Sequence, residues 1–242
     1  MKSLFLIGFF SLSTTIGMAQ LVETKRVPAG EDAGKFLSDN GLFRFINFTA
    51  GTYTMKNGST APALFNYNFL LGEMQYISPQ KTVLSIANPL DFNFFKVNDA
   101  IFYFRDGYKE VIKDYNNYKL AVGIEINTAP EKVGSYNSPA GATKSTSISS
   151  FQGMGGNFNG VSIGTGGNLG ELKTKEDVLL TKKTTYYLLD NEKSADVVNK
   201  KNILKIFGSK GPVADYLKEN PVNFNKRDEL IKLLDFCMQQ PK

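Results

Sequence analysis

Apolar and polar residues alternate along residues 63–77, the longest aromatic-rich run of this kind in the chain. Phe65, Tyr67 and Phe69 recur at every second position, with asparagines between them. This period of two is typical of a half-buried β-strand, because successive side chains of a strand point to opposite faces. We expect this strand to lie at the centre of a sheet, with the other strands organised around it.

Shorter alternating runs, separated by turn residues, continue the pattern over most of the chain. Strands at this spacing favour an antiparallel meander that forms a sandwich, a roll or a partly closed barrel. The predicted fold class is α+β and mainly β, with the meander over residues 41–190 and a three-helix cap after it. The predicted strands are 42–48, 51–56, 63–77, 81–87, 92–97, 101–104, 108–112, 118–126, 178–180 and 184–189.

Two dipeptides give strong turn signals. Asn57-Gly58 predicts a hairpin with a slightly longer loop, because a type I′ turn needs positive φ at both central residues and Asn-Gly adopts it readily. Asp106-Gly107 predicts a two-residue turn for the same reason.

The period of the pattern changes after residue 190, and residues 191–242 are predicted to form a helical segment packed on the sheet. Ser194 is expected to cap the first helix, which ends at Gly208. Pro212 opens the second helix, and the third begins near Asn225. An i, i+3, i+4, i+7 apolar stripe marks the third helix: Leu230, Leu233, Leu234 and Cys237.

A low-complexity insert over residues 128–173 interrupts the strands. Eight of the 18 residues in 153–170 are glycine. Such a segment buries too little apolar area to offset its ordering entropy, so we expect a mobile Gly/Ser-rich insert. Its run 164–170 superficially resembles a phosphate-binding loop, but that fingerprint follows a strand and opens a helix, a context that is not predicted here.

The N-terminal residues have the pattern of a secretory signal peptide. A positive charge and an apolar run are followed by Gly17 and Ala19, small residues suited to a cleavage site. We predict a signal peptide over residues 1–19, a mature chain from Gln20 and a flexible arm over 20–40. No cysteine follows the apolar run for lipid attachment, and no later stretch is apolar enough to span a membrane. The expected location is periplasmic, outer-membrane-associated or extracellular.

Composition excludes several chemistries. The chain has no histidine and one cysteine, Cys237, so neither an internal disulfide nor a Cys/His metal cluster can form. Catalysis by serine or cysteine with a histidine base is excluded as well. We predict no metal, no cofactor and no catalytic residue. Since the net charge of +5 is spread without long basic runs, no nucleic-acid partner is expected either. Cys237 lies on the apolar stripe and is predicted to be a core residue.

The aromatic residues allow two interpretations. They form the core of a β domain, or part of them lines an apolar cleft or face that binds a lipid, a glycan or a partner protein. The candidate binding surface is Phe65, Tyr67, Phe69, Tyr76, Phe102 and Phe104.

A carboxylate pair for glycoside hydrolysis would have to come from acids such as Glu73, Asp91 and Asp99. Strand carboxylates usually face water, so we expect these acids at the surface. Lys109 and Glu110 are likewise expected on the surface of an edge strand.

Five segments carry a resemblance to known proteins: 64–77, 99–112, 185–189, 199–207 and 216–224. In these segments the chain resembles a group of uncharacterised secreted proteins of Bacteroidota. The resemblance covers most of the mature chain apart from the insert, and it implies export but no particular activity.

The function we expect is that of an exported, non-enzymatic binding or structural module of the cell envelope, with an envelope protein or an apolar ligand as its partner. The alternative is a carrier of small apolar ligands or lipids, with a cavity between the sheet and the helices. A carboxylate-based hydrolase is the third hypothesis.

Overall fold

The computed structural model describes residues 21–28, 41, 43–69, 71–130, 178–191 and 194–240. The predicted signal peptide (1–19) lies outside the described residues, as do positions 29–40 of the predicted arm and 131–173 of the predicted insert.

The described residues form one open antiparallel sheet of 11 strands and a group of C-terminal helices, so the mainly β prediction with a helical cap is confirmed. Along the sheet the strand order is β1-β10-β9-β8-β7-β6-β2-β3-β4-β5, and β11 pairs with β10. The strands are β1 (Leu21–Val27), β2 (Thr49–Met55), β3 (Thr60–Asn68), β4 (Glu73–Ile77), β5 (Val83–Ser85), β6 (Phe92–Val97), β7 (Ala100–Phe104), β8 (Tyr108–Asp114), β9 (Tyr118–Pro130), β10 (Val178–Asp190) and β11 (Ala195–Val197). The helices are the 3-10 turn η1 (Pro89–Asp91), α3 (Lys200–Phe207), α4 (Pro212–Glu219) and α5 (Arg227–Gln239).

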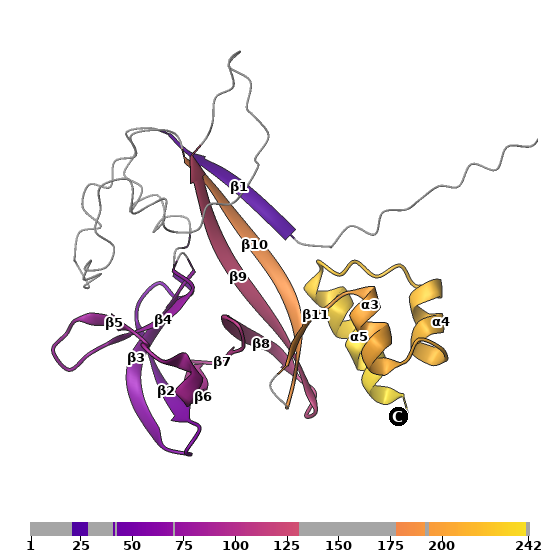
Figure 1. The fold of residues 1–242 in the computed structure, drawn as a ribbon, viewed down its shortest axis with the longest axis horizontal. Helices are drawn as coiled ribbons and strands as arrows, with labels where there is room; N and C mark the ends of the chain where they lie inside the picture. The colour runs from indigo at the N-terminus through magenta and orange to yellow at the C-terminus, as the bar shows by residue number, and fades with distance from the viewer. Residues whose placement is uncertain are drawn as a thin grey trace, which may run out of the picture.

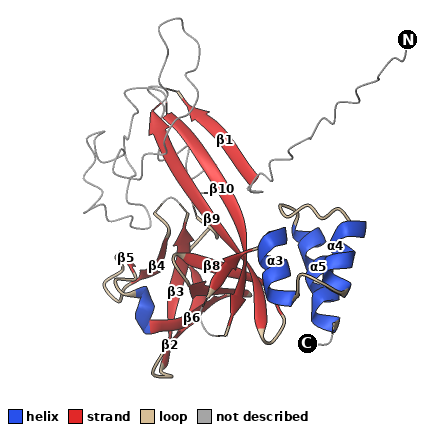
Figure 2. Cartoon of the chain, turned by 45° about the vertical axis from the view of Figure 1, so that its right-hand side comes forward, coloured by secondary structure: helices blue, strands red, loops and turns tan. Residues whose placement is uncertain are grey.

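The long strands β9 and β10 separate two parts of the molecule. Figure 1 shows β2–β7 on one side of this pair and the helices α3–α5 on the other, and Figure 2 shows the same division from a second direction. None of the helices in the described part of the chain combines the length and the apolar character needed to cross a lipid bilayer.

The stretch expected to be one central strand is two strands. Residues 60–68 form β3 and residues 73–77 form β4, and the two pair with each other from Phe65↔Tyr76 to Asn68↔Glu73. Gly72, at φ 67°, lies in the turn between them. The prediction of a single strand was wrong because Phe69 and Leu71 continue the apolar period of β3 into the turn, so alternation alone does not mark the break.

Three other local predictions also differ from the structure. Residues 44–47 form bends rather than a strand, and only Phe43 makes an isolated bridge, to Asn68. Leu21–Val27 of the predicted arm is a strand, which pairs along its whole length with β10. The loop at Asn57-Gly58 has positive φ at the glycine alone, because the Asn57 side chain accepts a hydrogen bond from the backbone N–H of Ser59.

The C-terminal helices follow their signals more closely. The first helix begins at Lys200, with Asn199 as its cap, whereas Ser194 donates to Asp190 in the turn before β11. Pro212 opens α4 as predicted. The apolar stripe of α5 is buried, and Leu233 on it has an exposed fraction of 0%.

Two apolar clusters fill the structure. One lies within the curled part of the sheet and is mainly aromatic; its buried members are Phe65, Tyr67, Phe69, Met74, Phe95, Val97, Phe102 and Tyr108. The other lies between the sheet and the helices; its buried members are Leu120, Leu188, Val198, Ile203, Val213, Leu217, Leu230, Leu233, Leu234 and Cys237.

Strand β9 contributes one face to both clusters. Leu120 packs with the helices, while Ile124 and Ile126 pack against the aromatic cluster. These residues are an even number of positions apart, so they share a face of the strand. The predicted apolar face of residues 118–126 is therefore present, but it is covered in two different ways.

Candidate functional site

An apolar pocket of about 900 Å³ opens beside strands β2, β3 and β4, the segment after β5, and η1. Four aromatic residues from different strands line it: Tyr53, Phe65, Tyr76 and Phe92. The Tyr53 ring meets Phe65 edge-on at 6.4 Å between centroids and Phe92 at 5.2 Å. Edge-to-face contacts of this kind are favourable, so the rings hold one another in place at the pocket wall.

Close backbone packing shapes one side of the pocket. Gly51 of β2 lies against β6, where a Cβ atom on this residue would be 2.5 Å from the carbonyl oxygen of Lys96 and 3.1 Å from the Phe65 ring. Real Cβ atoms do not come so close to a backbone oxygen. Only glycine therefore lets β2 pair with β6 in this way beneath Phe65.

Polar groups lie at the rim of the pocket. The lining includes Ser78, Ser85, Asn88 and Asp91. Asn88 donates a hydrogen bond from Nδ2 to Oδ2 of Asp91 at 2.8 Å, and the backbone N–H of Lys56 donates to the Asp91 carbonyl at 2.9 Å. Among the described residues that line the pocket, Asp91 alone carries a charge at neutral pH.

The six residues of the predicted binding surface divide between this pocket and the core. Phe65 and Tyr76 line the pocket, and Phe65 is at the same time a buried member of the aromatic cluster. Tyr67, Phe69 and Phe102 are buried in the aromatic cluster, and Phe104 packs against that cluster while half-buried. Sequence reasoning did not single out two aromatic lining residues, Tyr53 and Phe92, and it considered Asp91 only as a possible hydrolytic acid.

Burial has an electrostatic consequence inside the aromatic cluster. The rings of Tyr67 and Tyr108, from β3 and β8, lie 5.6 Å apart. Burial raises the pKa of both phenols above the usual range, since the apolar surroundings disfavour the phenolate. The Tyr108 hydroxyl is buried and has no hydrogen-bond partner among the described residues.

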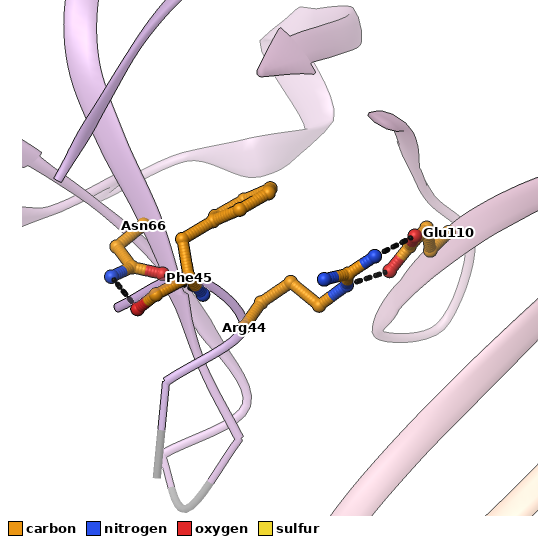
Figure 3. A network of polar contacts seen from close by, with 4 residues as sticks. All are labelled: Arg44, Phe45, Asn66 and Glu110. Atoms are coloured by element: carbon orange, nitrogen blue, oxygen red, sulfur yellow. Dashed lines mark hydrogen bonds and ion pairs between the residues drawn. The ribbon is translucent and has the colours of Figure 1, made fainter. Parts of the chain in front are cut away.

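The opposite face of β3 is buried as well. Asn66 and Asn68 each have an exposed fraction of 1%, although the alternation predicts a polar face turned to water. Asn66 accepts a hydrogen bond from the backbone N–H of Phe45 and donates one to its carbonyl, at 3.0 and 2.9 Å. Figure 3 shows this pairing, in which the side-chain amide of Asn66 makes the two hydrogen bonds that the backbone of a neighbouring strand would otherwise make.

The segment 43–48 also reaches strand β8. Arg44 donates from Nε and Nη2 to the two carboxylate oxygens of Glu110, at 2.7 and 2.9 Å (Figure 3). The Phe45 ring packs edge-on against Phe102 at 6.5 Å. Two-point pairing of a guanidinium with a carboxylate fixes orientation as well as distance. The segment thus joins β3 to β8, which lie far apart in the strand order, and it helps to hold the sheet curled.

Lys109 is not on a solvent-facing edge, as the sequence suggested, but is buried with an exposed fraction of 3%. Its ammonium group donates to the carbonyl of Asp106 at 2.8 Å and lies 4.5 Å from the centre of the Tyr187 ring. Burial lowers its pKa. A Cβ atom on Gly123 would be 3.2 Å from Cδ of Lys109, so the glycine makes room for this side chain.

Two of the acids considered for hydrolysis have separate partners. Glu73 accepts a hydrogen bond from Ser85 and Asp91 accepts one from Asn88, while Asp99 is exposed in the β6–β7 turn. Within the described ranges, no group of three or more potential ligands is arranged to hold a metal ion.

The fold therefore defines a mainly β protein with one open antiparallel sheet, an apolar pocket at the sheet and a C-terminal helical cap. Comparison with known proteins finds no matching family model, no matching curated protein and no matching solved structure.

Proposed function

We propose that this protein is an exported, non-enzymatic binding module, and that its apolar pocket holds a small ligand with an apolar body and an uncharged or cationic head. The observation that carries this proposal is the pocket itself, with aromatic rings from β2, β3, β4 and β6 around about 900 Å³. Ligand pockets commonly have volumes of roughly 300–1,000 Å³ and combine an apolar lining with a few polar groups.

The charge of the lining supports this ligand class over an anionic one. Asp91 places a carboxylate at the rim, and no basic side chain is present among the lining residues described. A fatty acid would bring its carboxylate toward Asp91 without a cation to compensate. The hydroxyl groups of Ser78 and Ser85 and the amide of Asn88 suit a neutral polar head, and Asp91 suits an amine.

The alternative cavity between sheet and helices has less support. The centre of that interface is filled by side chains with exposed fractions of 0%, including Leu120, Leu230 and Leu234. The proposal therefore assigns the apolar ligand to the pocket beside β2–β4 rather than to the centre of this interface. Export remains part of the proposal on the strength of the signal-peptide pattern in residues 1–19.

The test uses three ligands with the same alkyl chain and different heads: octanol, octyltrimethylammonium and octanoate. NMR titration of the mature protein is expected to show octanol and the cation shifting signals of the pocket residues, with octanoate binding at least about tenfold more weakly, a difference of 1.4 kcal/mol. Asp91→Asn, which keeps the size of the side chain, should remove the discrimination against octanoate.

A pair of variants on β3 provides the matched control. Ala63 lines the pocket, whereas Ala61, two residues earlier on the same face, is not a lining residue. Ala63→Phe should block binding and Ala61→Phe should leave it intact. Equal loss in both variants, preferential binding of octanoate, or no binding of any of the three ligands would refute the proposal.

A further inference from the structure

A second pocket lies at the other end of the molecule, between the β8–β9 turn and the C-terminal ends of α3 and α5, with a volume of about 960 Å³. Its walls differ from those of the apolar pocket, because polar and aromatic side chains alternate around it. The residues that line it are Asp114, Tyr115, Asn116, Asn117, Tyr118, Lys205, Ile206, Phe207, Gly208, Cys237, Met238 and Gln240.

Aromatic rings form part of its wall. Tyr118, at the start of β9, and Phe207, at the end of α3, pack with ring centroids 5.6 Å apart. Both are partly buried and both line the pocket, so they offer a fixed apolar surface. The ring carbons of a pyranose form an apolar face of matching size, with hydroxyl groups around its edge.

Hydrogen-bonding groups surround these rings. Two helices end at this pocket, where the carbonyl groups of Leu204, Phe236 and Cys237 already accept hydrogen bonds from Gly208 and Gln240. Asn116 and Asn117 in the turn expose side-chain amides, which donate and accept. The turn itself is fixed, because the backbone N–H of Asn116 donates to Oδ1 of Asp114 at 2.8 Å. Such a mixture of donors and acceptors suits hydroxyl groups, which need both.

Two charged residues line the pocket. Asp114 is paired with Lys119, with 3.1 Å between Nζ and Oδ2. Lys205 lies in the last turn of α3, where the negative end of the helix dipole favours a cation. The lining therefore carries one charge of each sign, and the ring pair with the turn amides favours a neutral ligand.

We infer that this second pocket binds a neutral, hydroxyl-rich ligand, and specifically the pyranose unit of a glycan. The inference is independent of the ligand proposed for the apolar pocket, because the two sites share no residue. The aromatic pair binds the carbon face of the sugar, and the side-chain amides of the turn bind its hydroxyl groups.

NMR titration of the mature protein with the methyl glycosides of glucose, galactose, mannose and N-acetylglucosamine tests the inference. At least one sugar is expected to bind with a Kd in the millimolar range and to shift signals of residues 114–118, 205–208 and 237–240. The absence of shifts with all four sugars, shifts confined to other regions, or tighter binding of inorganic phosphate would overturn it.

Variants at exposed asparagines separate binding from folding. Asn117→Ala should weaken sugar binding about twofold to thirteenfold, the effect of losing one hydrogen bond of about 0.5–1.5 kcal/mol. Asn93, exposed on β6 and remote from the pocket lining, is the matched control, and Asn93→Ala should bind as the parent does. Tyr118→Leu, which keeps an apolar side chain but removes the ring, should abolish binding while the circular dichroism spectrum is retained. Equal affinities for Asn117→Ala and Asn93→Ala, or undiminished binding by a folded Tyr118→Leu, would contradict the assignment.

Discussion

The curled part of the sheet and its helix-covered part bury their apolar faces by different means. In β2–β8 the sheet fills its own concave side with rings, and Tyr67 of β3 lies 5.8 Å from Phe102 of β7 and 5.6 Å from Tyr108 of β8. Where β9 and β10 continue, aliphatic residues of α5 cover the face instead, and none of the fully buried members of that cluster in the described part of the chain is aromatic.

Side-chain size explains this difference. A Phe or Tyr buries roughly 150–250 Å² and reaches across a curled sheet, so neighbouring strands can contact one another without a second layer. Leu and Val are shorter, and an open sheet bearing them needs another element to exclude water. A sheet face can therefore be buried in two ways: by aromatic side chains of the sheet itself, or by the apolar stripe of a helix packed on it.

The largest effect is expected from removing a central ring. Phe95→Ala should lower the free energy of unfolding by about 3–5 kcal/mol, because Phe95 is fully buried and contacts the rings of Phe65 and Tyr108. Urea denaturation followed by circular dichroism measures the change. Phe94→Ala, the neighbour on the opposite face, should cost clearly less; similar losses for both would contradict the two-faced description of β6.

Removing an aliphatic side chain from α5 tests how much the helix-covered face of the sheet contributes to stability. Leu233→Ala should lower the free energy of unfolding by about 2–5 kcal/mol, with Lys232→Ala within about 0.5 kcal/mol of the parent. Hydrogen exchange should quicken more in α5 and β9 than in β2–β6. Uniform loss of protection over the whole sheet would show that the two parts do not open separately.

Asn66 tests whether the second face of β3 depends on hydrogen bonds. Asn66→Ala leaves the N–H and carbonyl of Phe45 without their partner and should cost about 1–3 kcal/mol, measured by denaturation. Asn57→Ala, in the exposed β2–β3 loop, is the comparison and should have a smaller effect. An unchanged free energy of unfolding for Asn66→Ala would mean that water replaces both hydrogen bonds to Phe45.

The thiol of Cys237 reports on the helical cluster as pH changes. Burial raises the pKa of Cys237 to about 11 from its ordinary value near 9. The folded state therefore favours the protonated thiol, so its contribution to stability is complete below about pH 9 and is lost as the pH rises toward 11. Cys237→Ala should flatten this part of a stability–pH curve, and native protein at pH 8 should react with a thiol reagent far more slowly than unfolded protein. Fast reaction of the native thiol would place it outside the core.

The smallest effects are expected from one ion pair in each part, both anchored on β8. Glu110 pairs with Arg44 by two hydrogen bonds, and Lys113 pairs with Asp235 of α5 at 2.6 Å. The hydrogen bond from Lys113 lowers the pKa of Asp235. Double-mutant cycles should give couplings within about 0.2–1 kcal/mol, larger for Arg44–Glu110 because Glu110 is 18% exposed and Asp235 is 40% exposed. A larger coupling for Lys113–Asp235 would reverse the ranking.

Part of the candidate site was accessible from sequence. The aromatic-rich run 63–77 made Phe65 and Tyr76 candidate binding residues, and both line the apolar pocket. Alternation along one strand would place them on opposite faces, and only the pairing of β3 with β4 puts them opposite each other. Tyr53 also lies within a predicted strand, but the contact between its ring and that of Phe92 depends on the pairing of β2 with β6. The register of that pairing shifts between Thr54 and Met55. Local pattern carries no information on which strands pair across the sheet.

The sequence by itself determined the strong local features of this protein: alternation in its strands, the Asp106-Gly107 turn with positive φ at both residues, Pro212 at a helix start and the buried stripe of α5. Each depends on backbone preferences or periodicity within a few residues. Tertiary structure alone decided which polar residues are buried, as Asn66 and Lys109 show. A buried polar group is stable only where a partner satisfies it, and here the partners lie on other turns and strands that only the folded chain brings near.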